Sequence, residues 1–240
     1  MTRAEATPAG VPQVPVLSYH HVHDGPDDFF RTWPDTFARQ IETLLREGYR
    51  PLTPAQLAAA GEARERWALV TFDDAYVDFE THAWPVLRAL GVPAAVFVIS
   101  AHVGGTNAWD ELRWAEHAHL GAGALRRLHA AGAVIGSHTR THRPLVRLDA
   151  DELEVELRGS QAELEALLGA PVRALAYPGG ALGDEVCGAA ARHYDLAFAT
   201  DASHAGARCD RYRIPRFDPC FYGDLDAFRR ELDARCGLGR

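Results

Sequence analysis

The stretch ALVTFDD, residues 68–74, begins as an apolar run and ends in two adjacent carboxylates. A second stretch, AVIGSHTRTH, residues 133–142, has the same form and leads into His138 and His142. Short apolar runs bounded by polar residues are typical of strands buried in a parallel sheet. Both polar groups therefore follow a predicted strand directly. In parallel α/β folds, the carboxyl ends of the strands carry the functional residues.

The rest of the chain alternates between short β-like runs and amphipathic helical patterns. The other predicted strands are residues 14–19, 94–99, 174–177, 196–200 and 212–215. The predicted helices are residues 34–47, 77–90, 122–131, 150–168, 184–193 and 224–235. Glycines stand just after the last periodic apolar residue of four of these helices, as expected for helix ends, at Gly48, Gly91, Gly132 and Gly169. This alternation predicts an α/β fold with outer helices around a parallel sheet, as a barrel or an open sheet.

Length and composition indicate one domain. A chain of 240 residues with 47% hydrophobic residues can bury one large core, and no repeat or low-complexity linker divides it. Residues 1–12 are rich in proline and alanine and are predicted to be disordered. Residues 13–240 are predicted to form the single domain.

Charge and targeting signals exclude some partners. The net charge of −8 argues against binding to nucleic acid or to an anionic membrane. No apolar run is long enough for a signal-peptide core or a membrane span, so we expect a soluble, cytoplasmic protein. The four cysteines form no C-x-x-C pair and are expected to be free thiols.

Residue types in the two opening stretches suit a divalent metal. His138 and His142 are four residues apart, which brings two imidazoles to one side of a turn. One carboxylate added to them gives a set of two histidines and one carboxylate that leaves coordination positions open. Zinc is the first expectation, although cobalt, nickel, manganese or iron suits the same ligands. The second Asp is left to act as a base, and the spacing alone does not assign the two carboxylates.

Simpler interpretations exist for each part of this pattern. Asp73 and Asp74 could cap the helix that follows, since Asp is a favoured N-cap. Two histidines four apart can also arise by chance in a chain with 12 histidines. Surface or packing roles are expected for His117, His119, His129, His193 and His204. The two motifs gain weight because both stand at predicted strand ends.

The motifs T-F-D-D and S-H-T-x-T-H, followed by AYPGG at residues 176–180, resemble the polysaccharide deacetylases of carbohydrate esterase family four, the NodB-like group. The resemblance extends from Pro15 to about Phe228. It implies a distorted (β/α) barrel with about seven repeats. It also implies an enzyme that removes acetyl groups from N-acetylated sugars with a bound divalent metal.

Residue by residue, the resemblance implies roles for the two motifs. Asp74, His138 and His142 would be the metal ligands, and Asp73 would be the general base. The division has a physical basis, because a carboxylate bound to a metal loses basicity whereas its neighbour can still accept a proton.

The general acid is expected on the first strand. Many family members carry this acid in a C-terminal Leu-x-His-Asp stretch, which this chain lacks. Its VLSYHHV stretch, residues 16–22, is similar to the Tyr-His-x-Val signature of the poly-β-1,6-N-acetylglucosamine deacetylase branch. This implies His20 as the acid, with a packing role as the alternative. His21 and His23 are expected to be exposed loop residues.

Further residues are expected around the pocket. Arg216 would hold and orient Asp73, with a surface ion pair as the alternative. Tyr177, Pro178 and Gly179 would shape the pocket, and a backbone N–H of Gly179 could stabilise an oxyanion. Trp109 and Asp110 are expected to contact the sugar, with packing as the alternative for Trp109. These substrate contacts complete the predicted site.

The predicted function is metal-dependent N-deacetylation of a polysaccharide or oligosaccharide. One alternative is a deacetylase or amidase of a small molecule, such as a nucleotide- or lipid-linked sugar or a metabolite. Another is a catalytically silent glycan-binding protein. The complete set of Asp73, Asp74, His138 and His142 favours an enzyme, because a binding protein needs no base beside a metal.

Overall fold

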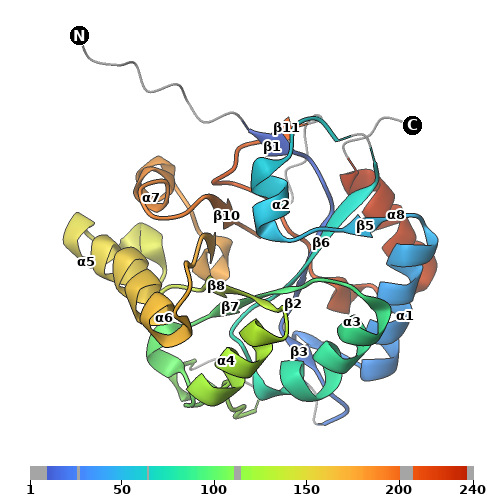
Figure 1. The fold of residues 1–240 in the computed structure, drawn as a ribbon, viewed down its shortest axis with the longest axis horizontal. Coiled ribbons are helices and arrows are strands. Elements are labelled where there is room, and N and C mark those ends of the chain that lie inside the picture. Colours follow the sequence, from blue (N-terminus) through green and yellow to red (C-terminus); the bar gives the residue numbers. More distant parts are fainter. Residues whose placement is uncertain (1–9, 26–27, 64, 111–114, 201–207, 237–240) are drawn as a thin grey trace.

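A computed structural model describes residues 10–25, 28–63, 65–110, 115–200 and 208–236 (Figure 1). Its centre is a parallel sheet in which six strands follow one another in the order β10-β9-β8-β7-β6-β2, and β5 pairs with β6. Their bounds are β2 (Val16–Tyr19), β5 (Arg50–Pro51), β6 (Trp67–Phe72), β7 (Ala95–Val98), β8 (Val134–Ser137), β9 (Ala174–Ala176) and β10 (Leu196–Phe198).

The sheet curls into a distorted barrel, and a later segment bridges its two edges. Parallel bridges join Ile214 to Phe198 of β10 and Phe217 to Leu17 of β2. The bonds are short: Ala199 N–H donates to Ile214 at 2.8 Å and Ser18 N–H donates to Phe217 at 2.8 Å. The predicted strand at residues 212–215 is thus present only as isolated bridges. Pro215 has no N–H to donate, so a regular ladder cannot form there.

Helices cover the outside of the sheet (Figure 1). They are α1 (Pro34–Arg46), α3 (Trp84–Leu90), α4 (Ala122–Ala130), α5 (Ala150–Glu154), α6 (Ser160–Leu168), α7 (Asp184–Ala190) and α8 (Leu225–Arg235). The predicted helices at 77–90 and 150–168 each contain a π-helical turn, at Phe79–Ala83 and Val155–Gly159. A further helix that the sequence pattern did not predict, α2 (Pro54–Ala59), begins with a capping box between Thr53 and Gln56.

Two small sheets complete the fold. β1 (Val11–Pro12) pairs antiparallel with β11 (Arg208–Cys209), and β3 (His21–Val22) pairs parallel with β4 (Arg31–Thr32). Residues 1–9 of the segment predicted to be disordered lie outside the described residues, whereas Val11 and Pro12 belong to β1.

Each barrel strand has two faces, because successive side chains of a strand point to opposite sides. One face packs in a large core with side chains of the surrounding helices, and this core includes Leu17, Val70, Val96, Ile135 and Leu175. The opposite face forms a separate core inside the barrel, which includes Val16, Leu69, Phe97, Phe198 and Ile214. The barrel is therefore filled by side chains at its amino-terminal end.

Toward the carboxyl ends of the strands, the inward face changes from apolar to polar. Every second residue of a segment faces inward, so the change is seen along residues that are two apart in sequence. It is seen in Val16, Ser18 and His20, in Leu69, Thr71 and Asp73, and in Ile214, Arg216 and Asp218. The same register that fills one end of the barrel therefore places titratable groups at the other end.

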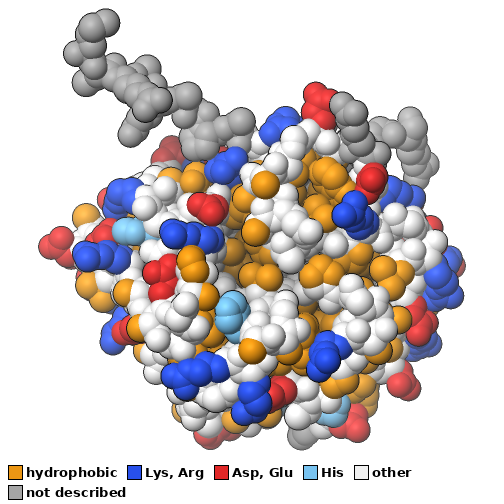
Figure 2. All heavy atoms as spheres, in the orientation of Figure 1, with side chains coloured by type: hydrophobic (Ala, Val, Ile, Leu, Met, Phe, Trp, Pro, Cys, Tyr) orange, Lys and Arg blue, Asp and Glu red, His pale blue; other side chains and the backbone are white. Residues whose placement is uncertain are grey.

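The surface carries a mixture of charges. Figure 2 shows basic and acidic side chains interspersed on one face, not gathered by sign. In the part of the chain that the structure describes, no helix is long and apolar enough to cross a membrane. Cys187, Cys209, Cys220 and Cys236 are free, as predicted.

Candidate metal and catalytic site

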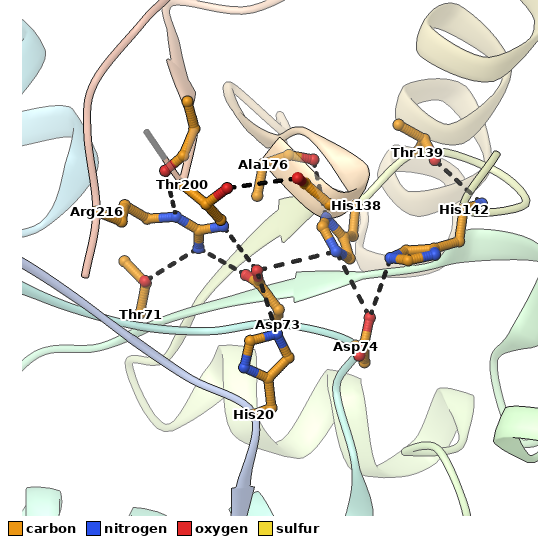
Figure 3. A network of polar contacts seen from close by, with 12 residues as sticks. His20, Thr71, Asp73, Asp74, His138, Thr139, His142, Ala176, Thr200 and Arg216 are labelled. Atoms are coloured by element: carbon orange, nitrogen blue, oxygen red, sulfur yellow. Dashed lines mark hydrogen bonds and ion pairs between the residues drawn. The ribbon is translucent and has the colours of Figure 1, made fainter. Parts of the chain in front are cut away.

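A pocket of about 680 Å³ opens where the inward face becomes polar. It contains side chains from strand ends far apart in the sequence: His20, Asp73, Asp74, His138, His142 and Arg216. Figure 3 shows these groups converging from different strands. The structure thus brings together all the residues that the sequence predicted as acid, base, metal ligands and orienting arginine.

Asp73 is held by a buried arginine. It continues the inward face of β6, and only 2% of it is exposed. Arg216, 1% exposed, donates from Nη1 to Oδ1 at 2.7 Å and from Nη2 to Oδ2 at 2.6 Å. Burial alone would raise the pKa of Asp73, but the Arg216 guanidinium and then His138 lower it well below its ordinary value. Asp73 is therefore ionised and fixed in orientation, and the surface alternative for Arg216 is wrong.

Asp74 has different surroundings from its neighbour. Its φ of 63° turns the chain sharply after the strand, so that two consecutive carboxylates face the same pocket. Its Oδ1 is buried and accepts no hydrogen bond from any described residue. The nearest basic nitrogens are His138 Nε2 at 3.5 Å and His142 Nε2 at 3.8 Å. A buried oxygen without a donor is the arrangement expected of a metal ligand.

The two histidines present suitable nitrogens to this oxygen. Nδ1 of His138 donates to the carbonyl of Ala176 at 2.8 Å, which leaves the Nε2 lone pair facing Asp74. Burial, followed by the nearby His138, lowers the pKa of His142 to about 4, so its ring is neutral at pH 7. One carboxylate oxygen of Asp74 and one ring nitrogen each of His138 and His142 lie within 4.8 Å of one another. These residues fit a divalent metal.

The backbone around these groups is strained. Among the described residues, the non-glycine residues with positive φ are Asp74, Ala75, Thr139 and His142. Such conformations cost about 1–3 kcal/mol each and persist where the surrounding structure enforces them. One local bond is that from His142 N–H to Thr139 Oγ1 at 3.2 Å. All of this left-handed backbone adjoins the candidate metal ligands.

His20 lies close to both Asp73 and Asp218. Its Nε2 is 3.9 Å from Asp73 Oδ2, and its Nδ1 is 3.2 Å from Asp218 Oδ2. Burial alone would lower the pKa of His20, but Asp218, Asp73 and Asp74 together raise it to about 9. Asp218 was not expected from its sequence context to have a role in the site. Its place two residues after Arg216 on the inward face is the signal that could have found it.

His119 and Trp109 together support the backbone of Asp74. Nδ1 of His119 is 2.7 Å from the carbonyl oxygen of Asp74, and Nε2 of His119 accepts from the Trp109 indole at 3.1 Å. The Trp109 ring also lies 4.4 Å from the ring of His142. Trp109 thus contacts one candidate ligand directly and reaches another through His119.

The predicted substrate-contacting residues divide into two groups. Gly179, Trp109 and Asp110 line the pocket. Tyr177 does not, because it faces the outer core and its hydroxyl donates to the carbonyl of Tyr212 at 3.0 Å. Pro178 is buried and is not among the lining residues. Tyr177 and Pro178, which were expected to shape the pocket, are thus not among the residues that line it.

The sequence analysis also missed an aromatic rim. Phe29, Phe30 and Phe221 line the pocket and are 55%, 36% and 58% exposed. The Phe30 ring stacks on His20 with centroids 4.4 Å apart. These three phenylalanines belong to no periodic pattern, so no local signal places them together.

Comparison with known proteins identifies the family. Residues 60–197 match the family model described as polysaccharide deacetylase. The chain belongs to this family. Within it, the chain is 26% identical over 209 residues to YxkH of Bacillus subtilis (strain 168), covering 85% of this chain and 70% of that protein.

A solved family structure shares the fold. The Streptococcus pyogenes deacetylase PplD in complex with acetate has a TM-score of 0.74 and 25% identity, over 88% of this chain and 93% of PplD. A shorter match is to the poly-β-1,6-N-acetyl-D-glucosamine N-deacetylase of Escherichia coli (strain K12). It is 32% identical over 84 residues, which are 32% of this chain and 12% of that protein.

Membership in the polysaccharide deacetylases has two consequences. The chain is a carbohydrate deacetylase of carbohydrate esterase family four, with the curled parallel sheet of the NodB-like fold. Deacetylases of this family are generally metal-dependent, and this chain has a histidine and aspartate group that could hold a metal.

Proposed function

We propose that this protein removes acetyl groups from N-acetylated amino sugars in a polysaccharide or oligosaccharide, with Asp73 as base and His20 as acid. The observation that supports this most directly is the different surroundings of two adjacent carboxylates. The negative charge of Asp73 is balanced by Arg216, which bonds both of its oxygens. Oδ1 of Asp74 instead faces two imidazoles and accepts no hydrogen bond from a described residue. Such a pair suits two different tasks in one reaction.

Asp74, His138 and His142 are the proposed metal ligands. A divalent ion held there, zinc or one of cobalt, nickel, manganese and iron, would polarise the acetamide carbonyl and make water a better nucleophile. The bond from His138 to the Ala176 carbonyl would keep its ring in the ligand orientation. Trp109 and His119 would limit movement of His142 and Asp74.

Asp73 is the proposed general base. Its carboxylate lies 3.9 Å from the nearest nitrogens of both His20 and His138, so it stands between the proposed acid and a proposed ligand. Arg216 holds both of its oxygens and keeps it ionised. The base therefore accepts a proton from water in a fixed orientation.

His20 is the proposed general acid. Asp218 lies beside Nδ1, so the proton on Nε2 faces the pocket toward Asp73. A pKa of about 9 keeps the imidazolium present at neutral pH. This proton would pass to the nitrogen of the departing amino sugar, which leaves as a free amine while acetate is released.

The pocket wall suits a sugar ring. Trp109, Phe30 and Phe221 offer apolar faces, and Asp110 offers a carboxylate in the same pocket. Aromatic faces pack against the C–H groups of sugars while carboxylates accept their hydroxyls. The similarity to a poly-β-1,6-N-acetyl-D-glucosamine deacetylase supports N-acetylglucosamine as the sugar, and the Tyr19-His20 segment supports the same branch.

The exposed phenylalanine rim supports a second candidate substrate. Phe29 and Phe221 leave more than half of their surface in contact with solvent, next to the pocket opening. An acetylated sugar linked to an apolar group would cover these rings, whereas a purely hydrophilic oligomer would leave much of them exposed. The same acid, base and ligands would act on either substrate.

Acetate release from N-acetylglucosamine oligomers of different linkage tests the function. Asp73→Asn should bind metal as the wild type does but lower kcat by about 100-fold or more, because only the base is removed. His138→Ala should lose both metal and activity. Equal turnover by Asp73→Asn and wild type would contradict the role of Asp73.

Comparing substrates tests the choice of sugar. Release of acetate from β-1,6-linked oligomers above that from other linkages would support the polymer substrate. Preference for a lipid-linked N-acetylated sugar would support the second candidate. No acetate from any N-acetylated sugar, by protein carrying its metal, would exclude both.

A further inference from the structure

A second group of imidazoles lies outside the proposed catalytic set. It consists of His21 in β3, His23 just after it, and His117 in the segment before α4. His21 and His23 are only 3% and 7% exposed, so the expectation that both are exposed loop residues is wrong. One ring nitrogen from each of the three lies within 4.8 Å of the other two.

Two carboxylates accompany these rings. Oδ2 of Asp28 lies 3.3 Å from His117 Nε2 and 3.9 Å from His21 Nε2. On the other side of His21, Nδ1 lies 2.7 Å from Oδ2 of Asp78. Histidine binds a metal as the neutral imidazole. Two carboxylates beside three such rings leave negative charge without a balancing cation, which favours binding of a cation among them.

The bond to Asp78 determines which nitrogen of His21 is available. The carboxylate accepts a hydrogen bond from Nδ1–H, so the lone pair of Nε2 faces Asp28 and His117. A carboxylate behind the imidazole is the usual second partner of a metal-ligating histidine, since it fixes the ring and its tautomer. Asp78 therefore supports His21 as a ligand without itself touching the metal.

Some nitrogens of the group lack hydrogen bonds. Nε2 of His23 and Nε2 of His117 are buried and make no well-formed hydrogen bond to a described residue, although Asp28 lies 3.3 Å from His117 Nε2. Buried polar atoms are nearly always satisfied, and exceptions gathered in one place mark a site for an ion or a ligand. Packing of aromatic rings alone, such as the 3.8 Å stack of His21 on Tyr76, does not account for them.

We propose that His21, His117 and Asp28 form a second divalent-cation site, with His23 as a fourth ligand. Two or three imidazoles with one carboxylate form a set that zinc binds tetrahedrally. His23 now accepts from Gly25 N–H at Nδ1, with a distance of 3.0 Å. It becomes a ligand through Nε2 when its proton moves to Nδ1 and that bond is given up. His21, His117 and Asp28 are accordingly the essential ligands.

A cation there would connect segments that form the pocket wall. Asp28 is followed by Phe29 and Phe30, and Phe30 stacks on His20. The backbone N–H of His117 donates to Oδ1 of Asn107 at 2.8 Å, and its carbonyl accepts from Asn107 N–H at 3.0 Å, two residues from Trp109. The second ion would therefore hold the His20 side of the pocket against the Trp109 side, as a structural metal.

Calorimetric titration of metal-free protein with Zn2+ counts the sites. The wild type should bind two equivalents per chain. His117→Ala and Asp28→Asn should each bind one, and the isosteric Asp28→Asn change is expected to leave the fold intact. His193→Ala is the matched control, because His193 also bonds a carboxylate, Glu154 at 3.0 Å, but belongs to neither group of possible metal ligands found among the described residues. It should still bind two.

Separate variants distinguish the two sites. His138→Ala should keep one equivalent, and Zn2+ should still raise its Tm. Adding His117→Ala to it should abolish both the binding and the shift in Tm. Asp78→Asn should weaken the second site about 10–100-fold without removing it. One equivalent in the wild type, or two in folded His117→Ala or Asp28→Asn, would overturn the proposal.

This outcome is independent of the proposed function. Two equivalents without any acetate release would leave the second site standing and reject the deacetylation reaction. If the wild type binds one equivalent, His138→Ala binds none and acetate release is normal, the second site is rejected and the deacetylation reaction stands.

Discussion

The protonation of His20 depends on three carboxylates around one imidazole. Asp218 lies at Nδ1, Asp73 faces Nε2, and Asp74 acts from farther away. Together they raise the pKa of His20 by more than burial of the ring lowers it. Burial alone would favour the neutral form. Asp218 contributes most among them, so the pKa of His20 is set mainly by a residue that lies far along the chain but in the same pocket.

Asp218→Asn should lower the pKa of His20 because it removes the largest charge that stabilises the imidazolium. If His20 acts as an acid, activity falls as pH rises through this pKa. The alkaline limb of the kcat/KM profile should therefore move to lower pH by about one unit or more. Asp224→Asn, an equal charge change at an exposed helix cap, should leave the limb in place. An unmoved limb in Asp218→Asn would contradict the assignment.

The same ionisation affects stability in a defined pH range. The pKa of His20 in the folded protein, about 9, lies above its ordinary value of 6.5. Its contribution to folding stability is thus complete below pH 6.5 and is lost as pH rises through about 9. Urea unfolding at several pH values should show this loss in the wild type and a smaller one in Asp218→Asn.

At the scale of elements, β8 contacts its neighbour very closely at Gly136. A Cβ added there would lie 2.5 Å from a ring carbon of Phe97 on β7 and 3.1 Å from the Ala174 carbonyl. The Arg216 guanidinium lies over the same Phe97 ring at 5.6 Å. Phe97 thus contacts both Gly136 of β8 and the arginine that holds Asp73.

Gly136→Ala should destabilise the protein by about 1–3 kcal/mol, since Phe97 has to move in a filled barrel. It should also lower activity, because the shift reaches Arg216. Gly188→Ala is the control: Gly188 is in α7 with no atom within 4 Å of an added Cβ. It should stabilise by about 0.5–1 kcal/mol. Chemical denaturation measures both, and an unchanged Gly136→Ala would contradict the close packing.

Sequence patterns predicted the regular elements better than the irregular ones. The runs that became β2, β6, β7 and β8 were identified to within two residues at either end, because buried parallel strands are continuous apolar runs. The π-helical turns at Phe79–Ala83 and Val155–Gly159 were not predicted, since an extra residue in one turn barely alters a helical pattern. α2 has six residues, too few to show a period.

Site residues were predictable where a motif named them and less so elsewhere. Arg216 was expected to reach Asp73, and it does so through both carboxylate oxygens. Asp218, His119 and the second imidazole group were missed, because their partners come from distant segments that no local spacing reveals. Tyr177 was assigned to the wrong face, since its strand places alternate residues on opposite sides.

For the whole molecule, closure of the barrel depends on Ile214 and its neighbours. Ile214 is 1% exposed in the inner core and bridges to Phe198, while Phe217 bridges to Leu17. The closing segment has no regular strand, so a few backbone hydrogen bonds to the two sheet edges and the burial of its side chains hold it in place. It also carries Arg216 into the pocket.

Ile214→Ala should destabilise the protein by about 2–5 kcal/mol through the cavity it leaves. Activity of the folded fraction should fall as well, because Arg216 is two residues away. Val146→Ala, at a side chain that is 50% exposed, should change stability by less than about 0.5 kcal/mol. Urea unfolding followed by circular dichroism compares the two, and equal small effects would show that closure does not depend on Ile214.

Barrel closure also sets an order of events during synthesis. The ribosome adds Arg216 143 residues after Asp73. Until then, the growing chain carries two adjacent carboxylates without the cation that makes burial of the first one favourable. A nascent barrel that buries Asp73 early would leave an unpaired charge, so the two carboxylates should stay hydrated until the closing segment arrives. The buried pair of Asp73 and Arg216 therefore forms late, after the closing segment has joined the barrel.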